Sequence, residues 1–332
     1  MAPPALSVRD LSVRYRGKDE AVHALQGLSF DLRPGQVLAL VGESGSGKTT
    51  AALALLRLLP AQGEVLSGQV LFEGRDLLQA SDHDLRQVRG RRAAIIFQDP
   101  VAGLNPVLSI GDQVAETLRS HVRMDRKQAR QAALDLLHRV GLAEPSRVAR
   151  AYPFQLSGGM CQRVMIAMAT ALNPAILIAD EPTSSLDVTV QAQILRQMDE
   201  MRTERGTAIL LITHDFGVVA HMADDVAVIY AGSIVEQGPA EQVMATPLHP
   251  YTAALLAATP RLDGERGPLR AIPGQSPTLA EPSPHCPFAP RCTKVVNRCR
   301  AGPPPPLASA DGDPAHSVAC YNTVWHWQEG AP

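Results

Sequence analysis

The clearest pattern along the chain is a series of short apolar runs, which predict the buried strands of a parallel sheet. The runs cover residues 37–41, 93–97, 175–179 and 208–213, and a further strand ends at Ala231. Between them, apolar residues recur at helical spacing from Asp125 to Val140, and Cys161 to Leu172 is typical of a second helix. Strands that alternate with helices predict an α/β fold.

The remaining segments predict smaller parts around this core. Residues 5–41 and 68–75 contain short strands with turns such as Arg33 to Gln36, which suit a small antiparallel sheet, and residues 105–170 are rich in helical patterns. Prolines become frequent after about residue 260, with four in succession at 303–306. We therefore expect a main domain over residues 5–260 and a loop-rich extension over residues 261–332.

Composition excludes several classes of function. Acidic and basic residues nearly balance, 33 against 31, and only 4% of the 332 residues are aromatic, so we expect no nucleic-acid partner. The N-terminus lacks the pattern of a signal peptide. The longest apolar stretch, residues 164–179, is interrupted by Asn173 and Pro174, and it is short for a span of roughly 20 residues. We therefore expect no membrane-spanning helix.

A phosphate-binding loop follows the first apolar strand. Its residues are Gly42, Glu43, Ser44, Gly45, Ser46, Gly47, Lys48 and Thr49, which complete the G-x-x-x-x-G-K-[ST] pattern. The glycines permit positive φ and close approach of the backbone, so that N–H groups can surround phosphates. Lys48 would reach the β- and γ-phosphates, Thr49 would hold Mg²⁺, and Thr50 would also contact the nucleotide. Thr50 to Leu59 would form a helix ended by Pro60. The pattern predicts binding of a nucleoside triphosphate.

Two further motifs identify the kind of nucleotide-binding protein. One is Leu156, Ser157, Gly158, Gly159 and Met160, with Ser157 in the position of a helix cap. The other is the strand at 175–179, which runs into Asp180, Glu181 and Pro182. With the loop at 42–49, these motifs resemble the ATP-binding cassette (ABC) ATPases over most of residues 5–260. That family usually has glutamine where this chain has Met160, but Ser157 and the backbone of the two glycines make the phosphate contacts.

The resemblance implies a role for each remaining site residue. Tyr15 would stack on adenine, although an ordinary strand aromatic is the alternative. Gln98 would contact Mg²⁺ and the attacking water, and Asp180 would hold Mg²⁺ through water. Glu181 would act as general base and His214 would contact the γ-phosphate. The loop that communicates between two cassettes would comprise Ser185, Leu186 and Asp187.

The extension carries a second chemical signal. Four of the five cysteines lie there, at Cys286, Cys292, Cys299 and Cys320. A reducing cytosol disfavours a disulfide framework, and a segment with little core of its own is suited to a metal that closes its loops. Spacing alone leaves zinc and iron–sulfur open, since both accept four thiolates. Cys161, within a predicted helix, fits a small packed residue.

The sequence around these cysteines resembles the C-terminal extension of dipeptide/oligopeptide ABC transporter ATPases. Residues 97–108 resemble a segment of the cassette of the same ATPases, and residues 249–252 resemble their helix after the cassette. The resemblance implies a [4Fe–4S] cluster, with zinc and metal-free or disulfide-linked cysteines as the alternatives. Because the cysteines lie far along the chain from Lys48, we expect the cluster to have a structural role.

The same resemblance implies the activity and the partners. The chain would be the ATP-hydrolysing subunit of a peptide importer, peripheral on the cytoplasmic face of the membrane. Two cassettes would face head to tail, each ATP lying between Lys48 of one and the Leu156–Met160 motif of the other. A paralogous second ATPase subunit is favoured over a second copy. Two membrane permeases and a solute-binding protein would complete the importer.

Three alternatives remain. ATPases of importers for nickel or another small solute share much of this sequence. ABC ATPases of DNA repair are disfavoured because no heptads are sustained between Lys48 and Ser157, and translation-type factors because the chain has one phosphate loop.

Overall fold

The computed structural model describes residues 3–17, 20–184, 186–259, 271–310 and 313–324. The chain divides into two compact units. The helical unit comprises Met1–Ala5, Leu32–Gln36 and Gln79–Ile212, and the P-loop unit comprises Leu6–Asp31, Val37–Leu78 and Thr213–Pro332. The predicted boundary between main domain and extension, at residues 260 and 261, lies outside the described residues.

Three short parallel strands form the sheet of the helical unit. They are β6 (Ala93–Ile96), β7 (Ile176–Asp180) and β8 (Ala208–Ile212), and β7 pairs with both of the others. Every residue of β7 and β8 is buried, which explains their unbroken apolar sequence. The three strands were predicted from the sequence to within one residue at each end.

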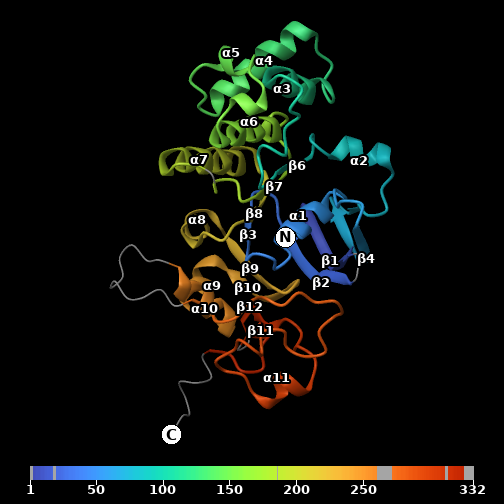
Figure 1. Cartoon of the computed structure of the whole chain (residues 1–332), viewed down its shortest axis with the longest axis vertical. Helices are drawn as coiled ribbons and strands as arrows, with labels where there is room; N and C mark the ends of the chain where they lie inside the picture. Colours follow the sequence, from blue (N-terminus) through green and yellow to red (C-terminus); the bar gives the residue numbers. More distant parts are fainter. Residues whose placement is uncertain (1–2, 18–19, 185, 260–270, 311–312, 325–332) are drawn as a thin grey trace. The chain divides into compact units, whose positions relative to one another are not determined.

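Helices make up the rest of the helical unit. They are α2 (Asp82–Val88), α3 (Ile110–Arg119), α4 (Arg126–Arg139), α5 (Pro145–Val148), the 3₁₀ turn η1 (Pro153–Gln155), α6 (Gly158–Thr170) and α7 (Val188–Arg205). Helices α3, α4 and α6 pack against one another (Figure 1). Asp125 and Gln128 form a capping box at the start of α4, whose buried face includes the Ala129 and Ala133 expected from the sequence.

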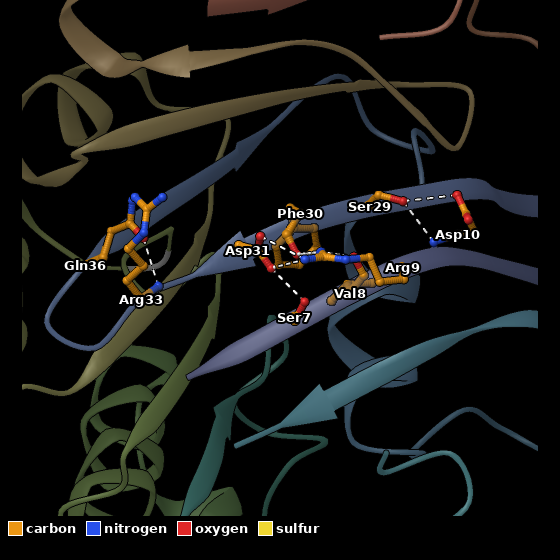
Figure 2. Close-up of polar contacts among 9 residues, drawn as sticks. All are labelled: Ser7, Val8, Arg9, Asp10, Ser29, Phe30, Asp31, Arg33 and Gln36. Carbon is orange, nitrogen blue, oxygen red and sulfur yellow. Dashed lines mark hydrogen bonds and ion pairs between the residues drawn. The ribbon is translucent and has the colours of Figure 1, made fainter. Parts of the chain in front are cut away.

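The P-loop unit contains the predicted antiparallel sheet. Its strands are β1 (Leu6–Arg16), β2 (Ala21–Leu32), β4 (Gly63–Phe72) and β5 (Arg75–Asp76), in the order β2-β1-β4-β5. Figure 2 shows that Ser7 and Arg9 of β1 both contact Asp31 of β2, at 2.7 Å from Ser7 Oγ and 2.7 Å from an Arg9 nitrogen to Oδ1. The Arg9–Asp31 pair is about half exposed, so it contributes little to stability and mainly favours this strand register.

The turn predicted at Arg33 to Gln36 belongs to the helical unit and is also drawn in Figure 2. The N–H of Arg33 donates to Oε1 of Gln36 at 2.8 Å, and the N–H of Gln36 donates back to the carbonyl of Arg33 at 3.1 Å. Gly35 has φ +69°, as position i+2 of a type II turn after proline requires. The predicted turn is therefore confirmed.

A second set of strands runs through the P-loop unit. Strand β3 (Val37–Val41) is parallel to β9 (Asp225–Tyr230), and β9 is antiparallel to β10 (Ser233–Pro239). The extension then adds β12 (Asp313–Val318) antiparallel to β10, and β11 (Ala308–Ala310) pairs with β12. The helices of this unit are α1 (Lys48–Leu55), α8 (Phe216–Met222), α9 (Ala240–Ala245), α10 (Pro250–Ala258) and α11 (Asn297–Ala301).

The helix after the phosphate loop is shorter than predicted. The sequence suggested Thr50 to Leu59, but α1 begins at Lys48 and ends at Leu55. Arg57 has φ +52°, and the N–H of Leu58 donates to the carbonyl of Leu53 at 2.8 Å. This is a Schellman ending with arginine in the position that glycine usually takes, so the sequence lacked the expected stop signal.

The extension is part of the core and is not only a loop-rich appendage, which corrects the prediction. Phe288 is 3% exposed and meets the ring of Tyr230 at 5.2 Å and that of Tyr251 at 5.3 Å between centroids. His316 of β12 lies 2.8 Å from the carboxylate of Glu236 in β10, and both side chains are buried. These contacts could not be predicted from the sequence because the partners are distant along the chain, and the high proline content indicated only loops.

No helix in the described part of the chain is long and apolar enough to cross a membrane.

Phe288→Ala should lower the free energy of unfolding of the P-loop unit by about 3–5 kcal/mol, because it opens a cavity among buried rings. The midpoint of urea unfolding, followed by circular dichroism, measures the change. Phe154→Ala is the matched control, since Phe154 is 73% exposed and its loss should cost at most about 0.5 kcal/mol. Equal midpoints for the two variants would show that Phe288 is not a core residue.

Candidate nucleotide site and four-cysteine site

The phosphate-binding loop lies between β3 and α1 and is shaped by close backbone contacts. A Cβ atom on Gly42 would lie 2.3 Å from the carbonyl oxygen of Ile229, and one on Gly47 would lie 2.5 Å from that of Ala24. Gly47 also has φ +107°. Neither position can hold a side chain without moving a neighbouring strand, which is the physical reason for both glycines.

The polar groups of the loop suit a phosphate chain. Lys48 is 8% exposed, and its Nζ donates to the carbonyls of Gly42 at 2.7 Å and Glu43 at 2.8 Å. Ser44, Gly45 and Thr49 are exposed. The hydroxyl of Ser46 is buried and makes no hydrogen bond among the described residues. The loop also opens directly into the first turn of α1, where unpaired N–H groups attract anions.

Tyr15 lies close to the start of α1. Its hydroxyl is 3.3 Å from Oγ1 of Thr50, and its ring is half-buried at the end of β1. The structure therefore brings together two of the residues predicted to contact the nucleotide. His214 also belongs to the P-loop unit, where it is exposed and precedes Asp215, the N-cap of α8.

The helical unit holds the other predicted catalytic residues. Asp180 is the last residue of β7 and is 3% exposed, whereas Gln98 is exposed just beyond β6. Glu181 has φ +47°, and its N–H donates to the carbonyl of Ile212 at 2.8 Å. A non-glycine residue in this conformation is strained, and such strain is found preferentially at functional sites.

The motif at 156–160 forms the exposed start of α6. Ser157 is the N-cap, and its Oγ accepts from the N–H of Met160 at 3.3 Å, as predicted. Ser157 and Gly158 are exposed, while Leu156, Gly159 and Met160 are half-buried. A capped, exposed helix start with small residues is suited to an anion that approaches from another molecule.

The predicted loop at 185–187 is described in part. Asp187 is the N-cap of α7 and accepts from the N–H of Val190 at 3.0 Å, and the N–H of Leu186 donates to the carbonyl of Thr183 at 3.2 Å. Ser185 lies outside the described residues.

The four cysteines of the extension are neighbours. All are free thiols, with Cys299 buried and the other three half-buried. Burial raises the pKa of the Cys320 thiol to about 12, and the thiols of Cys292, Cys286 and Cys299 add to the increase. Burial also raises the pKa of Cys286 and of Cys292. The thiols of Cys286, Cys292 and Cys320 therefore stay protonated at neutral pH unless a cation replaces their protons.

Backbone N–H groups donate hydrogen bonds to two of these sulfur atoms. The N–H of Lys294 donates to Sγ of Cys292 at 3.3 Å, and that of Asn322 donates to Sγ of Cys320 at 3.4 Å. Such donors stabilise a thiolate. Within the described ranges, however, no three His, Cys, Asp or Glu side chains are placed to hold one metal ion. The donor chemistry fits a thiolate-bound group, but the thiols do not converge on a single point.

Cys161 is buried in α6, with Sγ 3.6 Å from the carbonyl oxygen of Pro153, and burial raises its pKa. It is a packed residue, as the sequence suggested.

The sequence did not predict an ion pair of the phosphate loop. Arg291 of the extension pairs with Glu43 through two nitrogens, at 2.6 and 2.9 Å. No sequence signal marks this pair, since 248 positions separate its members.

Comparison with known proteins agrees with these motifs. Residues 25–184 match the family "ABC transporter", and residues 235–299 match "Oligopeptide/dipeptide transporter, C-terminal region". The second match includes Cys286, Cys292 and Cys299 but stops before Cys320. The solved dimeric structure of the ATP-binding cassette MJ0796 bound to ADP and Pi is 28% identical, with a TM-score of 0.65 over 71% of this chain and 98% of that one.

Two relatives are similar along almost their whole length. A probable peptide ABC transporter ATP-binding protein of Sinorhizobium fredii is 46% identical over 96% of this chain and 95% of its own. The dipeptide transport ATP-binding protein DppD of Bacillus subtilis is 44% identical over 95% and 94%. The predicted cassette fold is thereby confirmed, and the chain belongs to the ABC transporter family, among ATP-binding proteins that carry the oligopeptide/dipeptide transporter C-terminal region.

Proposed function

We propose that this chain binds and hydrolyses ATP to power the uptake of dipeptides or oligopeptides through a membrane ABC importer. The observation that carries the proposal is the presence in one chain of a formed phosphate-binding loop and of the oligopeptide/dipeptide transporter C-terminal region. Relatives named for peptide, oligopeptide or dipeptide transport match nearly the whole chain.

Each site residue has a defined part in this proposal. The N–H groups of residues 42–49 and the ammonium of Lys48 bind the phosphates, and Tyr15 stacks on adenine. Thr49, Gln98 and Asp180 would hold Mg²⁺. Glu181 takes a proton from the attacking water, and His214 contacts the γ-phosphate. The position of Glu181, directly after Asp180 at the end of β7, supports its assignment.

Hydrolysis in this proposal requires a second cassette. The start of α6 is exposed, capped and made of small residues. It is therefore suited to contact an ATP molecule that is bound by the phosphate loop of a partner subunit. The structure of MJ0796 with ADP and Pi is likewise described as dimeric. A paralogous subunit is the favoured partner, and two permeases receive the motion at the cytoplasmic face of the membrane while a solute-binding protein delivers the peptide.

We also propose that Cys286, Cys292, Cys299 and Cys320 hold a [4Fe–4S] cluster. Their proximity and the N–H groups aimed at two of the sulfurs support a thiolate-bound group. Zinc requires four sulfurs at about 2.3 Å from one point, whereas each thiol of a cluster binds a different iron. Zinc remains the alternative. When bound, either group would cross-link the loops of the extension.

Glu181→Gln should keep the affinity for ATP and reduce turnover by roughly 10²–10⁴-fold, since it removes the general base but no phosphate contact. ATPase activity of the assembled transporter and nucleotide titration of the chain measure the two effects. Lys48→Ala is the comparison and should weaken nucleotide binding itself. Wild-type turnover in Glu181→Gln would remove Glu181 from the mechanism.

Ser157→Arg should abolish ATP turnover in the assembled transporter but leave ATP binding by the isolated chain unchanged, because Ser157 serves the partner's nucleotide. The matched control is Ser81→Arg, which removes the N-cap of α2 in the same way. Equal losses of turnover in both variants would indicate damage to capped helices in general, and the proposed cassette dimer would lose this support.

Protein purified without oxygen should be brown, with broad absorption near about 400 nm and about four irons per chain. Cys292→Ser should lose the colour and expose residues after 270 to protease, whereas Cys161→Ser should keep both colour and protection. If the wild-type protein is colourless and contains one zinc per chain, the four cysteines bind zinc and not an iron–sulfur cluster. If the wild-type protein contains no metal and the residues after 270 resist protease equally well in Cys292→Ser, both the cluster and the zinc site are contradicted.

A further inference from the structure

The extension contacts the phosphate loop at one residue of that loop, Glu43. The guanidinium of Arg291 donates from two nitrogens to the two carboxylate oxygens, at 2.6 and 2.9 Å. The Arg291 side chain is 6% exposed and that of Glu43 is 25% exposed. A two-point pair that is mostly shielded from water is fixed in direction and is stronger than a surface ion pair.

The rest of the guanidinium is also held. Its Nε donates to the carbonyl of Pro273 at 2.8 Å, and one terminal nitrogen lies 3.3 Å from the hydroxyl of Tyr230. The turn that carries Arg291 is closed by a hydrogen bond from its N–H to the carbonyl of Phe288 at 2.9 Å. Since Phe288 is a core residue, the guanidinium is offered to the loop from a rigid support.

Glu43 passes this constraint to the lysine of the loop. Its backbone N–H donates to the hydroxyl of Tyr251 at 2.8 Å, and its carbonyl accepts from Nζ of Lys48 at 2.8 Å. Thus the side chain, the N–H and the carbonyl of one residue are all fixed. The extension and α10 together determine where this carbonyl, and with it the ammonium of Lys48, lies.

Charge gives the pair a second effect. Glu43 brings a carboxylate into a loop that has the form of a phosphate site, and two negative groups at close range repel each other. The guanidinium of Arg291 neutralises that carboxylate from the side of the extension. Without Arg291, the loop would lose part of its positive character as well as its support.

We propose that Arg291 is a positioning residue for nucleotide binding, through which the C-terminal extension sets the affinity of the phosphate loop. The inference rests on the proposed binding of ATP by residues 42–49. Arg291 acts through Glu43, and its other hydrogen-bond partners, Pro273 and Tyr230, are not among the residues proposed for catalysis or for Mg²⁺. Its loss therefore changes nucleotide affinity and leaves the chemical step intact.

The test is a titration of the purified full chain with a fluorescent ATP analogue and Mg²⁺. Arg291→Ala should raise the Kd by roughly 5- to 150-fold, the usual range for coupling between two sites. Arg291→Lys should give a smaller rise, because an ammonium keeps the charge but cannot make the two-point contact. Arg298→Ala is the matched control, since Arg298 belongs to the same extension and lies over the ring of Tyr321 at 4.4 Å.

A double variant separates the charge effect from the positioning effect. Arg291→Met with Glu43→Gln removes both charges at similar volume and should recover only part of the lost affinity, because no unpaired carboxylate remains but the two-point contact that holds Glu43 is still missing. In the assembled transporter, Arg291→Ala should raise the KM for ATP and leave kcat within about 2-fold, which a general loss of structure would not do.

Three results would overturn the inference. The first is that Arg291→Ala binds the analogue as tightly as Arg298→Ala, and the second is that the double variant binds it no better than Arg291→Ala. The third applies if circular dichroism shows that Arg291→Ala is unfolded: an unchanged affinity of Arg291→Lys for the analogue would then contradict the inference. Wild-type chain that fails to bind the analogue refutes the proposed function itself, so the two failures are distinguishable.

Discussion

The contact of main chain with main chain at the phosphate loop is the constraint on which the rest of the P-loop unit depends. Gly42 lies against the carbonyl of Ile229 in β9, and Gly47 lies against the carbonyl of Ala24 in β2. The N–H of Gly232, just after β9, also donates to the carbonyl of Ser46 at 3.0 Å. The loop thus takes its shape from two strands, and β9 is held in turn by β10. Any segment that fixes β10 therefore contributes to the site.

The extension is such a segment, because it has little core of its own and completes that of the cassette. Strand β12 pairs with β10, and Phe288 lies between Tyr230 and Tyr251. The fully buried carboxylate of Glu236 accepts from the N–H groups of Leu248 at 2.7 Å and His249 at 2.8 Å. His316 supplies a further partner, and a buried carboxylate is stable only when such partners are present. Extension and cassette therefore stabilise each other.

The sequence predicted what local chemistry determines. The strand Val37–Val41, the cap at Ser157 and the turn at 33–36 each depend on residues a few positions apart, and each is found. It did not predict the end of α1, since Arg57 takes a left-handed conformation without glycine. Nor did it predict the pairs Arg291–Glu43 and His316–Glu236, whose members are 248 and 80 positions apart. Proline content described the extension correctly as poor in regular structure but carried no information about its partners.

The position of Glu43 explains why the extension can reach the nucleotide loop at all. The phosphate-binding pattern fixes its glycines, its lysine and its last hydroxyl, and leaves the residues between them free. This chain places a carboxylate at the first free position, where it would oppose phosphate binding if it were unpaired. Arg291 makes that residue compatible with the site, and the aromatic cluster of Tyr230, Tyr251 and Phe288 holds both partners in place. The turn that carries Cys292 also carries the arginine that balances the charge of the loop.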